Sequence, residues 1–155
     1  MSKSKRRVES ALVEAGIFPD IRTMPDATRT AAQAAEAVGC QLDQIAKSII
    51  FRGENSGQVL LFLTAGGNSV DPQKAGEAAG EPLGKADAAF VRDKTGFAIG
   101  GVSPVGHLTA PTSFFDPRLL DFAVIWAAAG TPHAVFSISP RNLLKISAAQ
   151  VSDFT

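Results

Sequence analysis

The chain has 155 residues, of which 45% are hydrophobic and 19% are charged, and its formal net charge is +0. This composition is typical of a globular chain that folds as one domain over residues 1–155, and no apolar run reaches the roughly 18 residues that a membrane-spanning helix needs. The absence of a basic excess argues against a protein that grips long duplex DNA, because phosphate neutralisation supplies most of that affinity.

The N-terminus and the single cysteine bear on the cellular compartment. Residues Lys3–Arg7 are basic, but no apolar signal region follows them, so secretion is not expected. Cys40 has no second cysteine with which to form an internal disulfide, which fits a reducing compartment. We therefore expect a cytoplasmic protein. The basic cluster is open to two interpretations: a solvated N-terminus, which is favoured, or a local patch that touches the end of a nucleic acid.

Apolar spacing and turn signals predict helices and strands in an irregular alternation. In chain order we expect helix 4–15, an irregular stretch 17–26, helix 30–39, a turn 42–46, strands 48–51 and 58–64, helices 71–80 and 87–93, strand 97–99, a loop 100–107, strand 112–115, a short helix 116–120, strands 123–128 and 133–138, helix 141–146 and an edge strand 151–154. Hairpins are mixed with crossovers in this order. It therefore predicts a mixed α/β fold with one mixed sheet and helices packed around it, not a doubly wound parallel sheet.

Local capping signals support three of these helices. Thr30 with Gln33 three residues later forms a capping-box pattern, and Gly39 provides the stop. Asp71-Pro72 and Ser139-Pro140 are pairs of an N-cap residue and a first-turn proline. These helices should therefore begin where the sequence indicates.

Several common catalytic and binding motifs are missing from the sequence. No Gly-Lys-Ser/Thr follows a glycine run, no Gly-x-Gly-x-x-Gly follows a strand, and there is no Gly-x-Ser-x-Gly elbow. Cys40, His107 and His133 match no recognised zinc spacing. Cys40 alone is more typical of a small core residue than of a nucleophile. Neither a metal nor another cofactor is expected.

Lys47 is the first candidate for chemistry. It stands directly at the start of the hydrophobic strand 48–51, where the backbone is becoming buried. A partly buried ammonium needs a partner, and a phosphate or a carbonyl oxygen would serve. The spacing alone favours the other interpretation, an edge lysine whose stem is buried and whose charge reaches water.

The second candidate is the glycine-rich loop 100–107. Gly100, Gly101 and Gly106 allow the backbone to approach a ligand closely, and Pro104 stiffens the loop. Such a loop can direct successive N–H groups toward one point and stabilise an oxyanion. A tight structural crossover is an equally good interpretation of the loop alone.

Both candidates belong to an ordered series of motifs that covers nearly the whole chain, from about residue 8 to residue 154. The series comprises the helix Thr30–Gly39, Gln44-Ile45-Ala46-Lys47-Ser48-Ile49, Gly100-Gly101-Val102-Ser103-Pro104-Val105-Gly106-His107, Phe115-Asp116-Pro117-Arg118-Leu119-Leu120, Ala129-Gly130-Thr131-Pro132-His133 and Ser139-Pro140-Arg141-Asn142-Leu143-Leu144. Together they resemble the YbaK family, which is similar to the editing insertion of bacterial prolyl-tRNA synthetases.

The resemblance implies hydrolysis of mischarged aminoacyl-tRNA in trans, on a mostly antiparallel, partly barrel-like sheet. It implies that Lys47 is essential. It also implies that the substrate lies against residues of the loop and of a later turn, namely Gly100, Gly101, Val102, Ser103, Pro104, Gly106, His107, Gly130 and His133. The expected partners are the acceptor end of an aminoacylated tRNA, with tRNA(Pro) preferred, and prolyl-tRNA synthetase.

An aminoacyl ester is already activated, so the absence of a Ser-His-Asp set is no objection. Lys47 would hold the terminal phosphate or polarise the carbonyl, and N–H groups of Gly100–Ser103 would hold the oxyanion. A water or the neighbouring ribose hydroxyl would supply the attack, and His133 is a candidate general base. Alanyl-tRNA(Pro) is the preferred substrate. The alternatives are a cysteinyl-tRNA(Pro) or other small-residue deacylase, a non-catalytic binding module, and a hydrolase of a free amino-acid ester.

Overall fold

The computed structural model describes residues 2–28 and 30–155, and its helices begin close to where the sequence predicts them. Within these residues the helices are α1 (Lys3–Glu14), α2 (Ala31–Val38), α3 (Pro72–Ala79), α4 (Ala88–Thr95) and α5 (Pro140–Ser147), with the 3-10 helices η1 (Leu42–Gln44) and η2 (Pro117–Asp121). The Thr30–Gln33 capping box is confirmed, since each side chain accepts a hydrogen bond from the other residue's backbone N–H. Asp71 and Ser139 also cap their helices as predicted.

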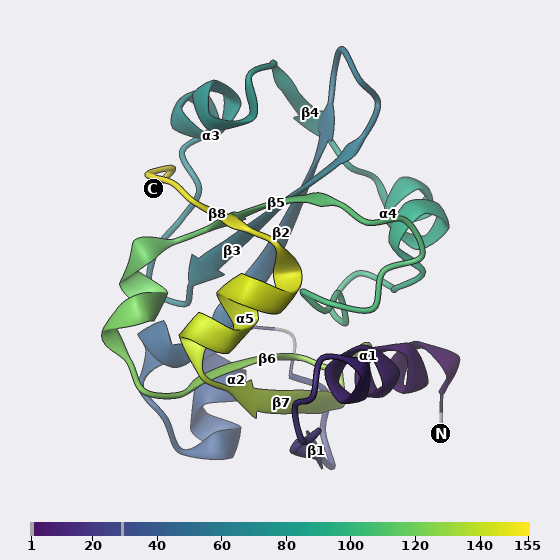
Figure 1. The fold of residues 1–155 in the computed structure, drawn as a ribbon, viewed down its shortest axis with the longest axis vertical. Helices are drawn as coiled ribbons and strands as arrows, with labels where there is room; N and C mark the ends of the chain where they lie inside the picture. Colours follow the sequence, from purple (N-terminus) through teal and green to yellow (C-terminus); the bar gives the residue numbers. More distant parts are fainter. Residues whose placement is uncertain (1, 29) are drawn as a thin grey trace.

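The strands form two sheets (Figure 1). The larger sheet has the order β4-β2-β3-β5-β8 and the smaller one the order β1-β7-β6. Their bounds are β1 (Ile21–Thr23), β2 (Ala46–Gly53), β3 (Val59–Ala65), β4 (Leu83–Lys85), β5 (Thr112–Phe115), β6 (Ile125–Ala128), β7 (Ala134–Ile138) and β8 (Gln150–Val151). The larger sheet is mixed, because β2 pairs antiparallel with β3 and β4 whereas β3–β5 and β5–β8 are parallel.

The mixed α/β class is therefore confirmed, with two corrections to its details. The expected single sheet is divided in two, joined within the described residues by one parallel bridge between Ile45 and Trp126. Neither sheet closes on itself, since both have a linear strand order with open edges, so the barrel-like arrangement is not formed. The predicted strand 97–99 is also wrong. Phe97 is fully buried there, but its backbone N–H donates to Thr95 Oγ1 and the oxygen of Ala98 accepts from the N–H of Gly101, so the segment is held by local turns and not by a strand partner.

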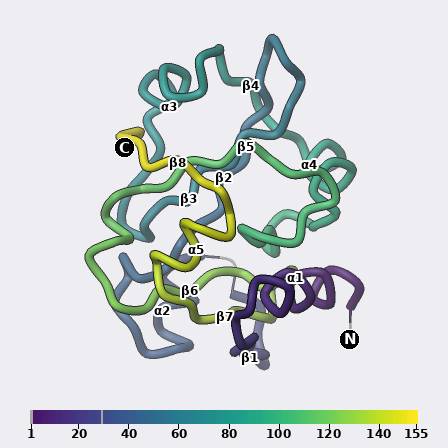
Figure 2. The backbone as a smooth tube through the Cα atoms, viewed as in Figure 1, coloured from purple at the N-terminus to yellow at the C-terminus, as the bar shows by residue number. Residues whose placement is uncertain are grey.

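The main core lies between the two sheets. Leu61, Leu63 and Phe115 of the larger sheet pack in one cluster with Ile125 and Phe136 of the smaller one. Helices α1 and α5 contribute to this cluster, and α5 lies between the two sheets in Figure 1. The opposite face of the larger sheet is covered by α3 and by the C-terminal segment, whose return past β8 toward α3 is visible in Figure 2. Strand β3 is consequently buried along its whole length.

Helix α1 is held by two glycines of the predicted site. A Cβ on Gly106 would lie 3.0 Å from the backbone of Arg7, and one on Gly130 would lie 2.8 Å from the backbone of Ser4. Both glycines also have positive φ, +80° and +96°. Arg7 adds hydrogen bonds to the backbone oxygens of Gly96 and Gly106. These glycines therefore have a packing role against α1.

Candidate active site

A cavity of about 690 Å³ lies along the outer edge of β2. Within the described residues β2 pairs with β4 only over Phe51–Gly53, and the bridge to β6 is formed by Ile45, the residue just before β2. The intervening edge, Lys47–Ile50, is therefore unpaired, and the two sheets diverge there. The six consecutive residues from Ile45 to Ile50 all border the resulting space.

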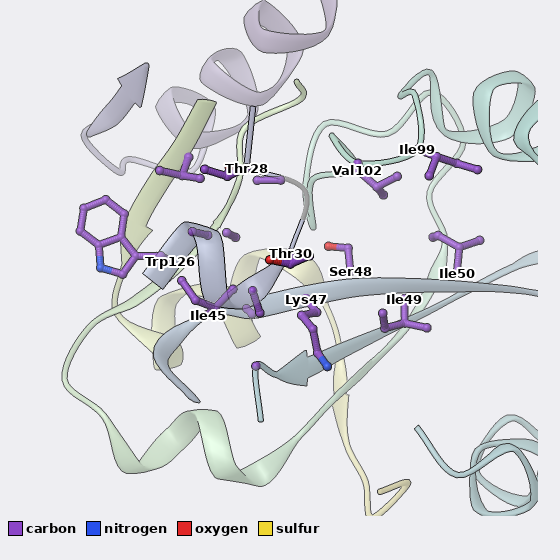
Figure 3. Close-up of a pocket in the computed structure, with 18 of the residues that line it drawn as sticks. Thr28, Thr30, Ile45, Lys47, Ser48, Ile49, Ile50, Ile99, Val102 and Trp126 are labelled. Carbon is purple, nitrogen blue, oxygen red and sulfur yellow. The ribbon is translucent and has the colours of Figure 1, made fainter. Parts of the chain in front are cut away.

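The cavity wall is mainly apolar with a few hydroxyl groups. The cavity is also bordered by residues of α2, of β6 and β7, and of the loop after α4. Few of the lining side chains are polar: Thr28, Thr30, Lys47, Ser48 and Thr131. Ser48 and Ile50 project into the cavity beside Ile99 and Val102, whereas Lys47 and Ile49 leave the strand on its other side (Figure 3). This is the alternation expected of a β-strand. The cavity thus suits a small apolar group with one or two hydrogen-bonding atoms.

Lys47 borders this cavity, but its side chain leaves β2 on the side away from Ser48 and Ile50. Nζ donates a hydrogen bond to the backbone oxygen of Asn68 at 2.5 Å, and the side chain is half-buried. Burial lowers the pKa of Lys47, while the negative charges of Asp116 and Asp43 act in the opposite direction. The partner is therefore a carbonyl oxygen, one of the two kinds of partner expected for a partly buried lysine at this position.

The glycine loop reaches the cavity with its first residues. Gly100 and Val102 border the space, and Gly100 has a φ of +94°. Gly101 packs so closely against Thr131 that a Cβ would lie 2.7 Å from its Cα. The N–H of Gly101 donates to the oxygen of Ala98 at 3.0 Å, whereas those of Gly100 and Val102 have no acceptor among the described residues. Because both residues border the cavity, these two N–H groups are candidates for meeting a ligand.

The other predicted site residues do not border the cavity. Ser103 and Pro104 are buried behind it. His107 lies further along the loop, where its ring stacks edge-on against Phe97 and its Nε2 meets the backbone oxygen of Ser103 at 2.5 Å. His133 is exposed in the turn between β6 and β7, two residues after Thr131. The structure thus brings Lys47, Gly100 and Val102 together and separates them from Gly106, His107, Gly130 and His133.

The burial of His107 predicts a pH-dependent stability. Burial lowers the pKa of His107 below its ordinary value, so the unfolded chain binds the proton more readily. This part of the stability is present above a pH of about 6.5 and is lost as the pH falls toward the folded-state pKa. His107→Gln keeps an amide donor for Ser103 but does not titrate. We expect the melting temperature to fall less for His107→Gln than for the wild type between about pH 7 and about pH 5. An equal fall in melting temperature for the two proteins over this pH range would contradict the prediction.

Two groups of residues were not predicted from the sequence. Ser48 Oγ is buried at the cavity and has no hydrogen-bond partner among the described residues. Its position next to Lys47 in an alternating strand was a usable signal, because one of the two side chains had to face the space beside the sheet. Asn68, Asp116 and Asp43 surround the Lys47 ammonium but are distant in sequence, and no local pattern indicates them.

The described residues contain no cluster of three His, Cys, Asp or Glu side chains arranged to hold a metal ion. In the same part of the chain, no helix has the length and apolar character needed to cross a membrane.

Comparison with known proteins identifies relatives of the whole chain. The sequence model of the aminoacyl-tRNA editing domain family matches residues 25–146. The protein YwhH of Bacillus subtilis (strain 168), which is uncharacterized, is 33% identical over 132 residues, covering 85% of this chain and 83% of YwhH. A crystal structure described as that of a candidate trans-editing enzyme for prolyl-tRNA synthetase is 46% identical, with a TM-score of 0.92 over 100% of this chain and 98% of the other. A chain from work on grafting linear epitopes onto scaffold proteins is 44% identical, with a TM-score of 0.93 over 100% and 99% of the two chains.

Proposed function

The chain belongs to the aminoacyl-tRNA editing domain family, and from this premise we propose that it hydrolyses mischarged aminoacyl-tRNA in trans, with alanyl-tRNA(Pro) as its substrate. One observation carries the proposal. A mainly apolar cavity is bordered by Lys47 and by Gly100 and Val102, whose backbone N–H groups have no acceptor among the described residues. The similarity to a candidate trans-editing enzyme for prolyl-tRNA synthetase supports the choice of tRNA.

The reaction needs charge stabilisation more than a strong nucleophile. Water attacks the ester carbonyl carbon, the bond from that carbon to the ribose oxygen breaks, and the ribose oxygen takes up a proton. The products are the free amino acid and a tRNA with a free terminal hydroxyl. Backbone N–H groups of Gly100 and Val102 stabilise the developing oxyanion. The positive charge of Lys47, a residue that borders the cavity, offsets the negative charge of this oxyanion. A neighbouring ribose hydroxyl is the candidate for handling the proton, because His133 does not border the cavity.

The size and lining of the cavity support a small acyl group. About 690 Å³ lies within the range of sites that hold ligands of nucleoside size. The terminal adenosine together with a small acyl group therefore fits this volume. A synthetase pocket discriminates against a missing methylene by only about 1–3 kcal/mol. Prolyl-tRNA synthetase therefore admits alanine, and a separate site that removes the alanyl ester restores accuracy.

Deacylation of alanyl-, cysteinyl- and prolyl-tRNA(Pro) by the purified chain tests the proposal. We expect the alanyl ester to be lost much faster with the chain present than in buffer alone. The prolyl ester should be lost at a rate close to that in buffer. Preferential cleavage of the cysteinyl ester would assign the same fold a different substrate. If all three esters decay at the buffer rate, the chain is a binding module and the deacylase proposal fails.

Ser48 provides a sharper test of where the substrate lies. Its hydroxyl has no partner among the described residues, so we expect it to accept a hydrogen bond from the substrate's amino group. Ser48→Ala should reduce kcat/KM for alanyl-tRNA(Pro) about fivefold, the worth of one neutral hydrogen bond. The free energy of unfolding should stay the same or rise by about 1 kcal/mol, because an unsatisfied buried hydroxyl is removed. Thermal denaturation of the variant is measured in parallel with its activity. If kcat/KM is unchanged in Ser48→Ala, the substrate's amino group does not bind at Ser48.

A further inference from the structure

Two carboxylates hold the short turn that follows β3. Asp116 Oδ2 accepts hydrogen bonds from the backbone N–H of Ala65 and from the side-chain amide of Asn68, each at 3.0 Å. Asp43 Oδ1 accepts from the backbone N–H of Gly67 at 2.7 Å. The turn therefore cannot shift without breaking bonds to both carboxylates.

Arg118 joins the two carboxylates to each other. Its backbone N–H donates to Asp116 Oδ1 at 2.9 Å, and its Nε donates to Asp43 Oδ2 at 3.0 Å. Asp116 is only 2% exposed, and a buried carboxylate is costly unless it is hydrogen-bonded. The bonds from Ala65, Asn68 and Arg118 meet this need.

The turn is also packed too tightly for ordinary side chains. A Cβ on Gly66 would collide with the backbone oxygen of Leu42, and one on Gly67 would collide with Asp43 Oδ1. The close approach of η1 therefore also restricts movement of the turn.

This fixed turn carries the acceptor of the Lys47 ammonium. Asn68 accepts from Lys47 Nζ with its backbone oxygen and donates to Asp116 with its side chain. None of the ion pairs among the described residues includes Lys47. The ammonium is thus bound directly to a neutral carbonyl and only indirectly to a buried negative charge.

Building on the proposed deacylase activity, we propose that Asp116 is a positioning residue, which through Asn68 fixes the position of the Lys47 ammonium beside the cavity. The neutral acceptor matters for the reaction. An ammonium paired directly with a carboxylate would have to break a strong charge-assisted bond to reach a substrate oxygen, whereas one bound to a carbonyl gives up a weaker bond. The negative charge of Asp116, which contacts Asn68 and not Lys47, opposes the effect of burial on the pKa of Lys47 and leaves the ammonium free of a direct ion pair.

The charged groups around Lys47 decide which variant tests this. Asp116 and Asp43 raise the pKa of Lys47 against the effect of burial. The positive charge of Arg118 is balanced by its ion pairs with Asp43 and Asp121. Asp116→Asn is the cleanest change, because the amide oxygen can replace Oδ2 toward Ala65 and Asn68 while the charge is removed. In this variant only the hydrogen bond that the backbone N–H of Arg118 donates to Asp116 Oδ1 is lost.

The experiment follows the Lys47 side chain directly by NMR titration of lysine ε-carbons, with its signal identified by its loss in Lys47→Ala. In Asp116→Asn we expect the Lys47 titration midpoint to fall by about one pH unit. The alkaline limb of the profile of kcat/KM against pH should move the same way. Asp153→Asn is the matched control, because that carboxylate forms an exposed pair with Lys74 on another part of the surface. It should leave both quantities unchanged.

Asn68→Ala separates position from charge. It removes the side-chain bond to Asp116 but leaves the charge and the backbone oxygen, so kcat should fall about tenfold with little change in KM, while the titration midpoint stays near the wild-type value. This variant also carries the test if Asp116→Asn does not fold. A Lys47 midpoint in Asp116→Asn equal to that in Asp153→Asn, or a kcat unchanged in Asn68→Ala, overturns the proposal. If the wild-type chain cleaves no ester, the deacylase proposal fails, and the NMR midpoints alone still decide whether Asp116 sets the state of Lys47.

Discussion

Replacing Lys47 with alanine is expected to reduce kcat/KM for alanyl-tRNA(Pro) by about 10²- to 10³-fold, as when one preorganised oxyanion-stabilising group is lost. Lys47 is the one positively charged residue that borders the cavity among the described residues. Without this charge, only the N–H groups of Gly100 and Val102 stabilise the developing oxyanion. Single-turnover deacylation with enzyme in excess measures this loss without a contribution from product release.

Two further variants show whether the charge or merely the bulk of Lys47 is needed. Lys47→Arg keeps the charge but replaces a compact ammonium with a planar guanidinium, which cannot occupy the same site beside the Asn68 oxygen. We expect an intermediate rate, about tenfold below the wild type. Lys74→Ala removes a lysine from an exposed ion pair with Asp153 and should be without effect. Activity of Lys47→Ala within twofold of the Lys74→Ala control would show that a different group performs the chemistry.

The helices could be predicted because their signals are local. Thr30 with Gln33 and Asp71 with Pro72 act within four residues of one another, and the structure confirms both caps. The β2–β3 hairpin was predictable for a similar reason, since its two strands are joined by a short polar loop. The three-residue strands β1 and β4 were not predicted. They have no periodicity of their own and exist only because β7 and β2 offer them an edge.

The site could be predicted only in part. Lys47 and Gly100 were identified as candidates from their residue types and their neighbours, and both border the cavity. The network around Lys47 could not be found this way, because its hydrogen bonds join residues 21, 48 and 51 positions apart. The roles of Gly106 and Gly130 were also hidden. A glycine in a turn gives no indication of which helix will pack against it. Here the helix is α1, which lies more than 90 positions before Gly106 in the chain.

Gly101→Ala is expected to lower both the stability and the activity. The new Cβ would lie 2.7 Å from Thr131 Cα and 2.9 Å from its carbonyl carbon, which are backbone atoms that cannot rotate away. The loop must therefore move away from the turn between β6 and β7. Because Gly100 and Thr131 both border the cavity, this movement changes its shape. We expect a loss of about 1–3 kcal/mol in the free energy of unfolding from overpacking. We also expect a fall of about tenfold or more in kcat/KM from the displaced N–H groups.

Gly16→Ala distinguishes local displacement from general destabilisation. Gly16 has a φ of +77°, and a Cβ at this position would have no neighbouring atom within 4 Å, so alanine there brings backbone strain without a collision. It should cost about 1 kcal/mol of stability and leave kcat/KM unchanged when activity is measured well below the melting temperature. If Gly101→Ala behaves like Gly16→Ala, losing stability alone, the loop is a structural crossover and its N–H groups do not reach the substrate. If Gly101→Ala loses activity as well, the loop takes part in the reaction, and the spacing between the loop and Thr131 is part of the catalytic geometry.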